Sequence, residues 1–316
     1  MAQADQVQIS QNTAVEEHRP TWMTLSAFAI IYFVWGSTFL AIRVGVHEVP
    51  PLLFAAMRFL TAGILLFGWT MLRKEKAPSG RQWISVSVLA FLIFVVDYGL
   101  LFWAEQRVAS GIAAVMMAVI PAFMALFEII FLRTQRLTVR LCAALLIGFA
   151  GVAVLMSHSF NLGSAAIDTV GAVALIVASI SWAIASVLSR KLRLPQSKVV
   201  SSGAQMLAGG AMLTLGAAAL GEFRNLHPEM ISARAWFSLV YLIVAGSIIG
   251  FTAYVWLIHH ESPTKVGTYA YVNPVVAVLL GYFLAGESLG PRTIVGTLFI
   301  LISVVLITTG PKKAAG

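Results

Sequence analysis

Residues 82–104 read QWISVSVLAFLIFVVDYGLLFWA, and this stretch decides the class of fold. Its one charged side chain is Asp97. A helix needs about 20 predominantly apolar residues to cross a bilayer. A membrane-barrel strand is about half as long and alternates apolar with polar side chains, which this stretch does not do. The stretch therefore predicts a transmembrane helix.

Charge-poor stretches of similar length follow one another along the chain. The predicted spans are residues 24–45, 51–72, 82–104, 108–131, 139–157, 167–190, 199–220, 234–258, 264–286 and 292–309. The composition agrees, because 59% of the residues are hydrophobic and 11% are charged, against about 25% charged in soluble domains. We expect an all-α membrane protein with ten transmembrane helices. A single cysteine, Cys142, excludes an intramolecular disulfide and a cysteine metal cluster.

The positive charge is distributed unevenly between the loops. With the N-terminus inside, 15 of the 21 Lys and Arg side chains fall on the inner side, five fall on the outer side, and Arg58 lies within a span. Loops rich in Lys and Arg remain on the cytoplasmic side of a membrane. Both termini are therefore predicted to be cytoplasmic. This bias accounts for the net charge of +8 and leaves no reason to expect a nucleic-acid partner.

The chain carries signs of an internal duplication. At an offset of 147 residues the matched pairs are Trp35 with Trp182, Arg43 with Arg190, Arg58 with Gln205, Leu60 with Leu207, and Gly63 with Gly210. At offsets of 153 and 148 they are Tyr98 with Phe251, Trp103 with Trp256, Pro121 with Pro274, and Gly148 with Gly296. Each unit holds five predicted helices, so the second begins on the opposite side of the membrane. The pattern predicts a 5+5 inverted repeat, an architecture of secondary transporters.

The predicted organisation follows from this duplication. We expect a disordered cytoplasmic tail over residues 1–23, a first five-helix repeat over 24–157, a linker over 158–166, a second repeat over 167–309 and a cytoplasmic C-terminus over 310–316. The chain lacks the Gly-x-x-x-x-Gly-Lys pattern of a phosphate-binding loop, which disfavours direct use of ATP.

Four motifs resemble the EamA family of the drug/metabolite transporter superfamily. They are YFVWGSTFLAIR at 32–43, MRFLTAGILL at 57–66, AEQRVASGIAAV at 104–115 and TYAYVNPVVAVLLG at 268–281. The resemblance extends over nearly the whole chain, from about residue 24 to residue 309. It implies a ten-helix permease of the inner membrane, one that exports amino acids or related small metabolites through a central cavity. It does not identify the solute.

Two prolines are predicted to lie near the middle of the membrane. Pro121 and Pro274 are repeat-related, and a proline inside a span frees a backbone carbonyl. Such a carbonyl is tolerated where it lines a cavity, so we predict a pathway or hinge role; a simple packing kink is the alternative. Tyr269, Tyr271 and Asn273 supply hydrogen-bonding groups beside Pro274.

Two charged residues lie inside predicted spans at a similar depth, Arg58 and Asp97. Ionisable groups inside a membrane are costly and usually face a partner or a water-filled path. Three readings stay open: a structural ion pair between them, a solute carboxylate held by Arg58, and a proton carried by Asp97. The repeat-related position of Arg58 holds Gln205, which joins the predicted pathway.

Glu105 ends the third predicted span. It is predicted to gate the pathway, to bind solute or to pair with Arg107, and it is the second candidate for proton coupling after Asp97. Glu128 lies near the inner end of its span, where we expect it to reach water by snorkelling.

Four tryptophans form two repeat-related pairs, Trp35 with Trp182 and Trp103 with Trp256. Ser37 and Thr38 place small hydroxyl groups next to Trp35. A large ring beside a small polar group serves either solute binding or close helix packing, and the sequence leaves both open.

The favoured function is secondary transport of a small solute by alternating access. An intramembrane enzyme is disfavoured, because His47-Glu48 and His260-Glu261 lack the second histidine of a zinc-protease helix. A lipid scramblase or a structural membrane protein is the alternative, and polar groups in a lipid-facing groove would support it. No metal and no organic cofactor is implied, and the oligomeric state stays open.

Overall fold

The computed structural model describes residues 21–108, 110–134, 136–160, 168–285 and 291–309. All regular structure in these residues is helical, so the predicted all-α class is confirmed. Most of the predicted N-terminal tail, most of the linker at 158–166 and the C-terminal segment at 310–316 lie outside the described residues.

Six of the described helices are long and apolar enough to cross a membrane. They are α2 (Thr21–Val46), α3 (Pro51–Leu72), the composite span Gly80–Glu105, α9 (Thr169–Leu188), α10 (Lys198–Ala219) and the composite span Ala233–His260. The first composite span joins α4 (Gly80–Ala90), the π-helical segment η1 (Phe91–Tyr98) and α5 (Gly99–Glu105). The second joins α11 (Ala233–Tyr241), the π-helical segment η5 (Leu242–Phe251) and α12 (Thr252–His260). Two single-turn helices, η3 (Glu222–Asn225) and η4 (Pro228–Met230), precede α11.

Two predicted spans are not continuous helices, which corrects the sequence prediction. Residues 108–131 contain α6 (Ser110–Met117), α7 (Ile120–Phe127) and the start of η2 (Glu128–Leu132), and Pro121 lies in the first turn of α7. Proline is tolerated there because the first N–H groups of a helix have no partner within it. Residues 264–286 contain most of the short α13 (Pro263–Val266) and then α14 (Tyr269–Ala285), in which Pro274 is internal. The two prolines therefore occupy different local structures.

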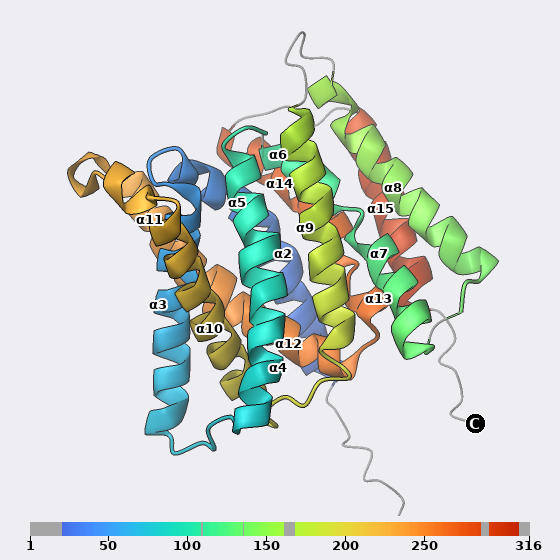
Figure 1. The fold of residues 1–316 in the computed structure, drawn as a ribbon. Coiled ribbons are helices and arrows are strands. Elements are labelled where there is room, and N and C mark those ends of the chain that lie inside the picture. The colour runs from blue at the N-terminus through green and yellow to red at the C-terminus, as the bar shows by residue number, and fades with distance from the viewer. Residues whose placement is uncertain (1–20, 109, 135, 161–167, 286–290, 310–316) are drawn as a thin grey trace, which may run out of the picture.

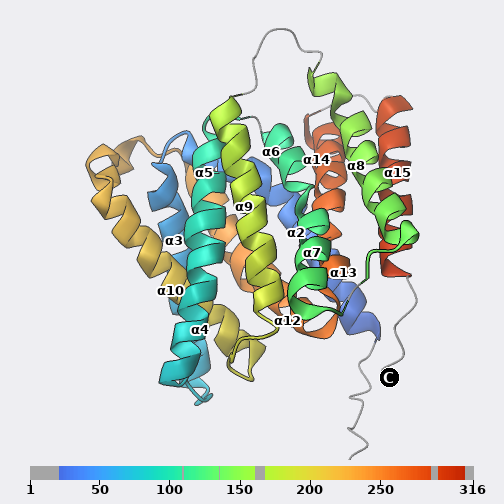
Figure 2. The ribbon, with the colours of Figure 1, turned by 45° about the vertical axis from the view of Figure 1, so that its right-hand side comes forward.

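The helices form a bundle with a pair at each edge. At one edge α3 packs against α10, and at the other α8 (Val139–Phe160) packs against α15 (Pro291–Thr308) (Figures 1 and 2). The α3–α10 pair approaches closely because both helices carry glycine at the crossing. A Cβ added at Gly63 would lie 2.4 Å from the Leu207 nitrogen, and one added at Gly210 would lie 2.3 Å from the Leu60 nitrogen.

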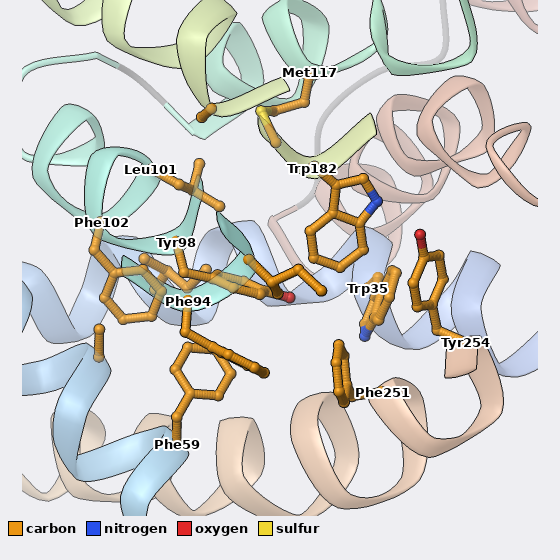
Figure 3. Packing of buried hydrophobic residues seen from close by; sticks show 14 of the residues in the cluster. Trp35, Phe59, Phe94, Tyr98, Leu101, Phe102, Met117, Trp182, Phe251 and Tyr254 are labelled. Carbon is orange, nitrogen blue, oxygen red and sulfur yellow. The ribbon is translucent and has the colours of Figure 1, made fainter. Parts of the chain in front are cut away.

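The core of the bundle is rich in aromatic side chains. Figure 3 shows Phe59, Phe94, Tyr98 and Phe102 gathered on one side and Trp35, Trp182 and Tyr254 on the other. Each of these rings is at most 8% exposed. Aromatic rings bury large apolar areas and prefer edge-to-face or offset contacts, which favours a fixed arrangement over a fluid one. This arrangement surrounds the candidate site.

Candidate functional site

A pocket lies in the middle of the bundle, between α2, the η1–α5 part of the third span, α6 and α7, α9 and α14. Its aromatic lining consists of Trp35, Phe39, Tyr98, Trp182 and Tyr269, and its polar lining consists of Thr38, Asp97 and Asn273. Apolar side chains complete the wall, and the free space is narrow. Pockets of mostly apolar lining with a few placed polar groups are typical ligand sites.

The two tryptophans of one repeat-related pair meet at this pocket. The ring centroids of Trp35 and Trp182 lie 5.5 Å apart in an edge-on arrangement. Tyr254 packs against both indoles, with its ring centroid 5.2 Å from that of Trp35 and 4.9 Å from that of Trp182 (Figure 3). Tyr269 lies edge-on to Trp35 at 5.0 Å. The Trp35 indole N–H donates to the Gly246 carbonyl at 3.0 Å, which fixes the orientation of the ring.

Two polar side chains of the pocket have oxygens without a hydrogen-bond partner among the described residues. These are Oδ1 of Asp97 and Oδ1 of Asn273, and the two residues are 1% and 3% exposed. The third polar residue, Thr38, donates its hydroxyl proton to the Trp35 carbonyl at 2.7 Å. Buried polar atoms are nearly always paired in native proteins, so unpaired acceptors in a pocket point to a ligand or to water.

Asp97 owes its position to η1. The π-helical segment ends at Tyr98, immediately after Asp97. Segments of this kind are rare and occur frequently at functional sites, because the wider turn displaces the following side chains from a regular helical register. The third span therefore carries its single internal charge where its helical geometry is irregular.

Arg58 lies outside the pocket lining, against the wall behind Tyr98. Its Nε donates to the Ser247 hydroxyl at 2.8 Å. The guanidinium lies over three aromatic rings, with centroid distances of 4.5 Å to Phe59, 5.1 Å to Tyr98 and 5.9 Å to Phe102. Among the described residues Arg58 and Asp97 form no ion pair, so the reading that these two charges neutralise each other is not supported. Cation–π contacts with these three rings surround the guanidinium where that reading would place a carboxylate.

Glu105 is buried at the end of α5, and neither of its carboxylate oxygens has a hydrogen-bond partner in the part of the chain that the structure describes. The predicted Glu105–Arg107 pair is not formed. Arg107 instead binds Asp168 at 3.5 Å and covers the Trp103 ring at 4.4 Å. At the start of α9, Asp168 accepts a hydrogen bond from the Gly171 N–H. This bond and the neighbouring Arg107 lower the pKa of Asp168.

The other predicted pathway residues do not line this pocket. Ser37 contacts the Tyr241 hydroxyl at 2.5 Å, and the Gln205 amide donates to the Ser201 hydroxyl at 3.0 Å. Trp256 stacks on His260.

The predicted residues of α14 and α7 lie in different surroundings. The Tyr271 hydroxyl donates to the Leu145 carbonyl at 3.3 Å, in a separate cluster beside α8 and α15. Pro121, at the start of α7, lies beside Gly267, which is between α13 and α14. It directly follows Ile120, which lines the pocket. Pro274 follows the pocket residue Asn273 in α14.

Sequence reasoning missed Tyr98 and Tyr254 as site residues. Tyr98 lines the pocket, and Tyr254 packs on both tryptophans. The signal was available for Tyr98, which follows Asp97 and matches Phe251 in the repeat. Tyr254 lies one helical turn after Phe251, and its repeat-related position holds Leu101, so the duplication did not mark it.

Glu128 does not reach water, which corrects the predicted snorkelling. It is 2% exposed and accepts hydrogen bonds from the Thr264 N–H at 3.1 Å, from the Thr264 hydroxyl at 2.7 Å and from the Thr134 hydroxyl at 3.0 Å. Thr264 lies in the first turn of α13. The carboxylate therefore caps that helix and ties η2 to it.

A helical membrane bundle with a central aromatic pocket that holds buried polar atoms is the design of a small-solute transporter. The comparison with known families agrees: the chain belongs to the EamA-like transporter family, which it matches over residues 22–157 and 169–309. The resemblance seen in the sequence motifs is thereby confirmed.

Known relatives are similar over most of their length. The chain is 38% identical to the uncharacterized inner membrane transporter YedA of Escherichia coli over 286 residues, which is 90% of each protein. It is 25% identical to an uncharacterized transporter of Archaeoglobus fulgidus, over 89% of this chain and 95% of that protein. It is 28% identical to the protein PecM of Dickeya dadantii, over 87% and 88%. A crystal structure with 21% identity has a TM-score of 0.74 and covers 92% of this chain and 97% of its own, which shows the shared fold.

Proposed function

We propose that the chain is a secondary, non-ATP transporter that moves a small solute across the inner membrane by alternating access. The solute class that the family resemblance favours is amino acids or related small metabolites, moved outward. The observation that carries the proposal is the central pocket, in which Asp97 and Asn273 hold unpartnered oxygens among aromatic rings. Membership of a transporter family and the names of the relatives support it.

We further propose that the two halves form a 5+5 inverted repeat around this pocket. Three pairs of sequence-matched features support it. The repeat-related Trp35 and Trp182 touch each other. Gly63 and Gly210 make reciprocal approaches to the backbones of Leu207 and Leu60. The π-helical segments η1 and η5 end at the matched residues Tyr98 and Phe251. The halves of an inverted repeat are related by a pseudo-two-fold axis in the membrane plane. When they rock against each other, a central site is exposed to each side of the membrane in turn.

The proposed orientation has both termini in the cytoplasm. The first residues of α2 and the last residues of α15 lie at the same end of the bundle (Figure 2). The excess of Lys and Arg in the loops at that end supports its cytoplasmic assignment.

In this proposal Trp35, Thr38, Trp182, Tyr269 and Asn273 contact the solute, and Asp97 is the first candidate for its charged group or for a coupled proton. Glu105 is the second candidate for the proton, because it is buried and unpartnered in the described part of the chain. Ser37, Gln205, Trp103 and Trp256 lie away from this pocket and would contact the solute only in another conformation. The scramblase alternative loses support, because the polar groups lie inside the bundle and not in a lipid-facing groove.

Uptake into proteoliposomes tests the proposal. The panel is labelled threonine, homoserine, cysteine, an aromatic amino acid together with its decarboxylated amine, and a sugar, with and without an imposed pH gradient. We expect at least one amino-acid-related solute to accumulate above protein-free vesicles, and dependence on the gradient would indicate proton coupling. Lipid flipping by the folded protein without movement of any solute would overturn the proposal in favour of the scramblase.

A further inference from the structure

The central pocket combines a buried acid with aromatic rings and contains no basic side chain. Asp97 is its single charged lining residue, and no Lys, Arg or His contributes to the wall that the described residues form. Arg58 is not among the lining residues; its Nε donates to the Ser247 hydroxyl, its guanidinium lies over the rings of Phe59 and Tyr98, and its Nη1 has no partner among the described residues. The described ion pairs do not include Asp97. The described lining of the pocket therefore carries one acidic group and no basic group.

The unpartnered atoms of the lining are two acceptors and one neutral donor, the Trp182 indole Nε1. Both Asp97 Oδ1 and Asn273 Oδ1 are acceptors, and each is buried without a donor among the described residues. An ionised carboxylate is costly to bury unless a positive partner neutralises it. A ligand that fits the two oxygens has to bring N–H donors, and the carboxylate favours a positive charge on it.

The aromatic lining suits the same ligand. Trp35, Trp182 and Tyr269 line the pocket with Tyr98. Aromatic faces attract cations, and cages of several rings are a recurrent recognition device for ammonium groups. A solute carboxylate would find no cation in this lining and a single neutral donor, the Trp182 indole N–H, and it would lie in the same pocket as the Asp97 carboxylate.

We propose that the pocket takes a small organic ammonium ion that lacks a free carboxylate, and that it discriminates against the corresponding zwitterionic amino acid. Asp97 and Asn273 accept the N–H bonds, and Trp35, Trp182 and Tyr269 surround the remaining surface of the cation. The inference rests on the proposed transport function for its physiological meaning. The chemistry of the pocket can be tested without transport.

Four compounds that share the isobutyl side chain of leucine separate the possibilities: leucine, leucinamide, 3-methylbutylamine and 3-methylbutanol. Binding of each radiolabelled compound is measured by equilibrium dialysis with the full-length protein in nanodiscs, and protein-free nanodiscs correct for partition into lipid. We expect leucinamide and 3-methylbutylamine to bind, and leucine and the alcohol to bind at least about 10-fold more weakly.

Three variants locate the effect. Asp97→Asn keeps the shape and removes the charge, and we expect it to weaken amine binding about 10- to 100-fold. Glu222→Gln is the matched control, because Glu222 is another buried carboxylate but accepts bonds from the Leu52 and Leu53 N–H groups at the start of α3, outside the pocket. It should bind the amines as the wild type does. Arg58→Gln tests the zwitterion reading, and amine binding should survive it.

Equal binding of leucine and 3-methylbutylamine, or loss of leucine binding in Arg58→Gln, would overturn the inference. So would unchanged amine binding in a folded Asp97→Asn protein, as judged by its elution and its melting temperature. Two further results separate the inference from the transport proposal. Amine binding that depends on Asp97 with no solute crossing the membrane would support the pocket chemistry and contradict transport. Uptake of another solute with no amine binding would support transport and overturn the inference.

Discussion

Asp97 and Glu128 are both buried carboxylates in apolar helices, and they have opposite surroundings. Glu128 is 2% exposed and accepts three hydrogen bonds from Thr264 and Thr134. Asp97 is 1% exposed and has an oxygen without any partner among the described residues. A buried charge whose donors come from its own chain holds the fold together. One that lacks them is a candidate for binding a ligand.

The largest effect is expected from removal of the Glu128 carboxylate. Glu128→Ala leaves the buried Thr264 N–H and hydroxyl without their acceptor. At about 1–3 kcal/mol for each of these two unsatisfied buried donors, we expect the free energy of unfolding to fall by about 2–6 kcal/mol. Reversible unfolding in mixed micelles measures it. Glu128→Gln retains one acceptor and should lose less; a loss equal to that of the alanine variant would contradict the capping role.

Asp97→Asn should show the reverse pattern. Because the carboxylate has no protein cation to lose, we expect the free energy of unfolding to stay within about 1 kcal/mol of the wild type. The rate of solute uptake in proteoliposomes should fall by about 10-fold or more, the value of one charge-assisted hydrogen bond. Destabilisation comparable to that of Glu128→Ala, with normal uptake at every pH, would make Asp97 a structural residue.

The individual donors to Glu128 sharpen the same comparison. Thr264 is 1% exposed, whereas Thr134 is exposed. We expect Thr264→Val to lower the free energy of unfolding by about 1 kcal/mol, and Thr134→Val by less than about 0.5 kcal/mol, because water replaces a donor at an exposed position. Glu128→Ala already removes the acceptor of the Thr264 hydroxyl. In that background Thr264→Val should therefore cause little further loss in the free energy of unfolding. Additive costs in this double-mutant cycle would show that the two side chains are independent.

The smallest effect is expected at Glu48, an exposed carboxylate with its donors in place. The Ser232 N–H and hydroxyl donate to it at 2.6 Å and 2.7 Å and lower its pKa. A lowered pKa in the folded state means that the contact stabilises the fold above the usual Glu pKa and is lost as the pH falls through the lowered value. Melting temperatures at pH 7 and pH 4 should therefore converge slightly in Glu48→Gln relative to the wild type. An unchanged difference would exclude this contribution.

The sequence was sufficient for the helical class and for most span positions, because charge-free runs of about 20 residues have few alternatives in a bilayer. It did not reveal the break between Met117 and Ile120, although Pro121 marked the position, since a proline within a span is compatible with a kink, a break or an N-terminus. Of the predicted site residues, six line one pocket, and their contact with a solute stays a prediction: Trp35, Thr38, Asp97, Trp182, Tyr269 and Asn273.

The remaining predicted site residues could not be sorted because a sequence does not say which face of a helix points to the centre. Trp103 and Trp256 are repeat-related like Trp35 and Trp182, yet they pack against Arg107 and His260. Glu128 is buried with hydrogen-bond donors because Thr264 lies beside it. Thr264 is far away in sequence, and only the tertiary fold brings the two residues together. Long-range partners of this kind decide whether a charge is structural.

The contact between Trp35 and Trp182 also gives the protein an optical signal of its own. Two indoles with centroids 5.5 Å apart, one from each half of the chain, are close enough for their electronic transitions to couple. A rearrangement that separates the halves would change the near-ultraviolet circular dichroism and the fluorescence of this pair. If the bundle opens as proposed, this signal would report it in real time without any attached dye, with Trp182→Phe as the spectroscopic blank.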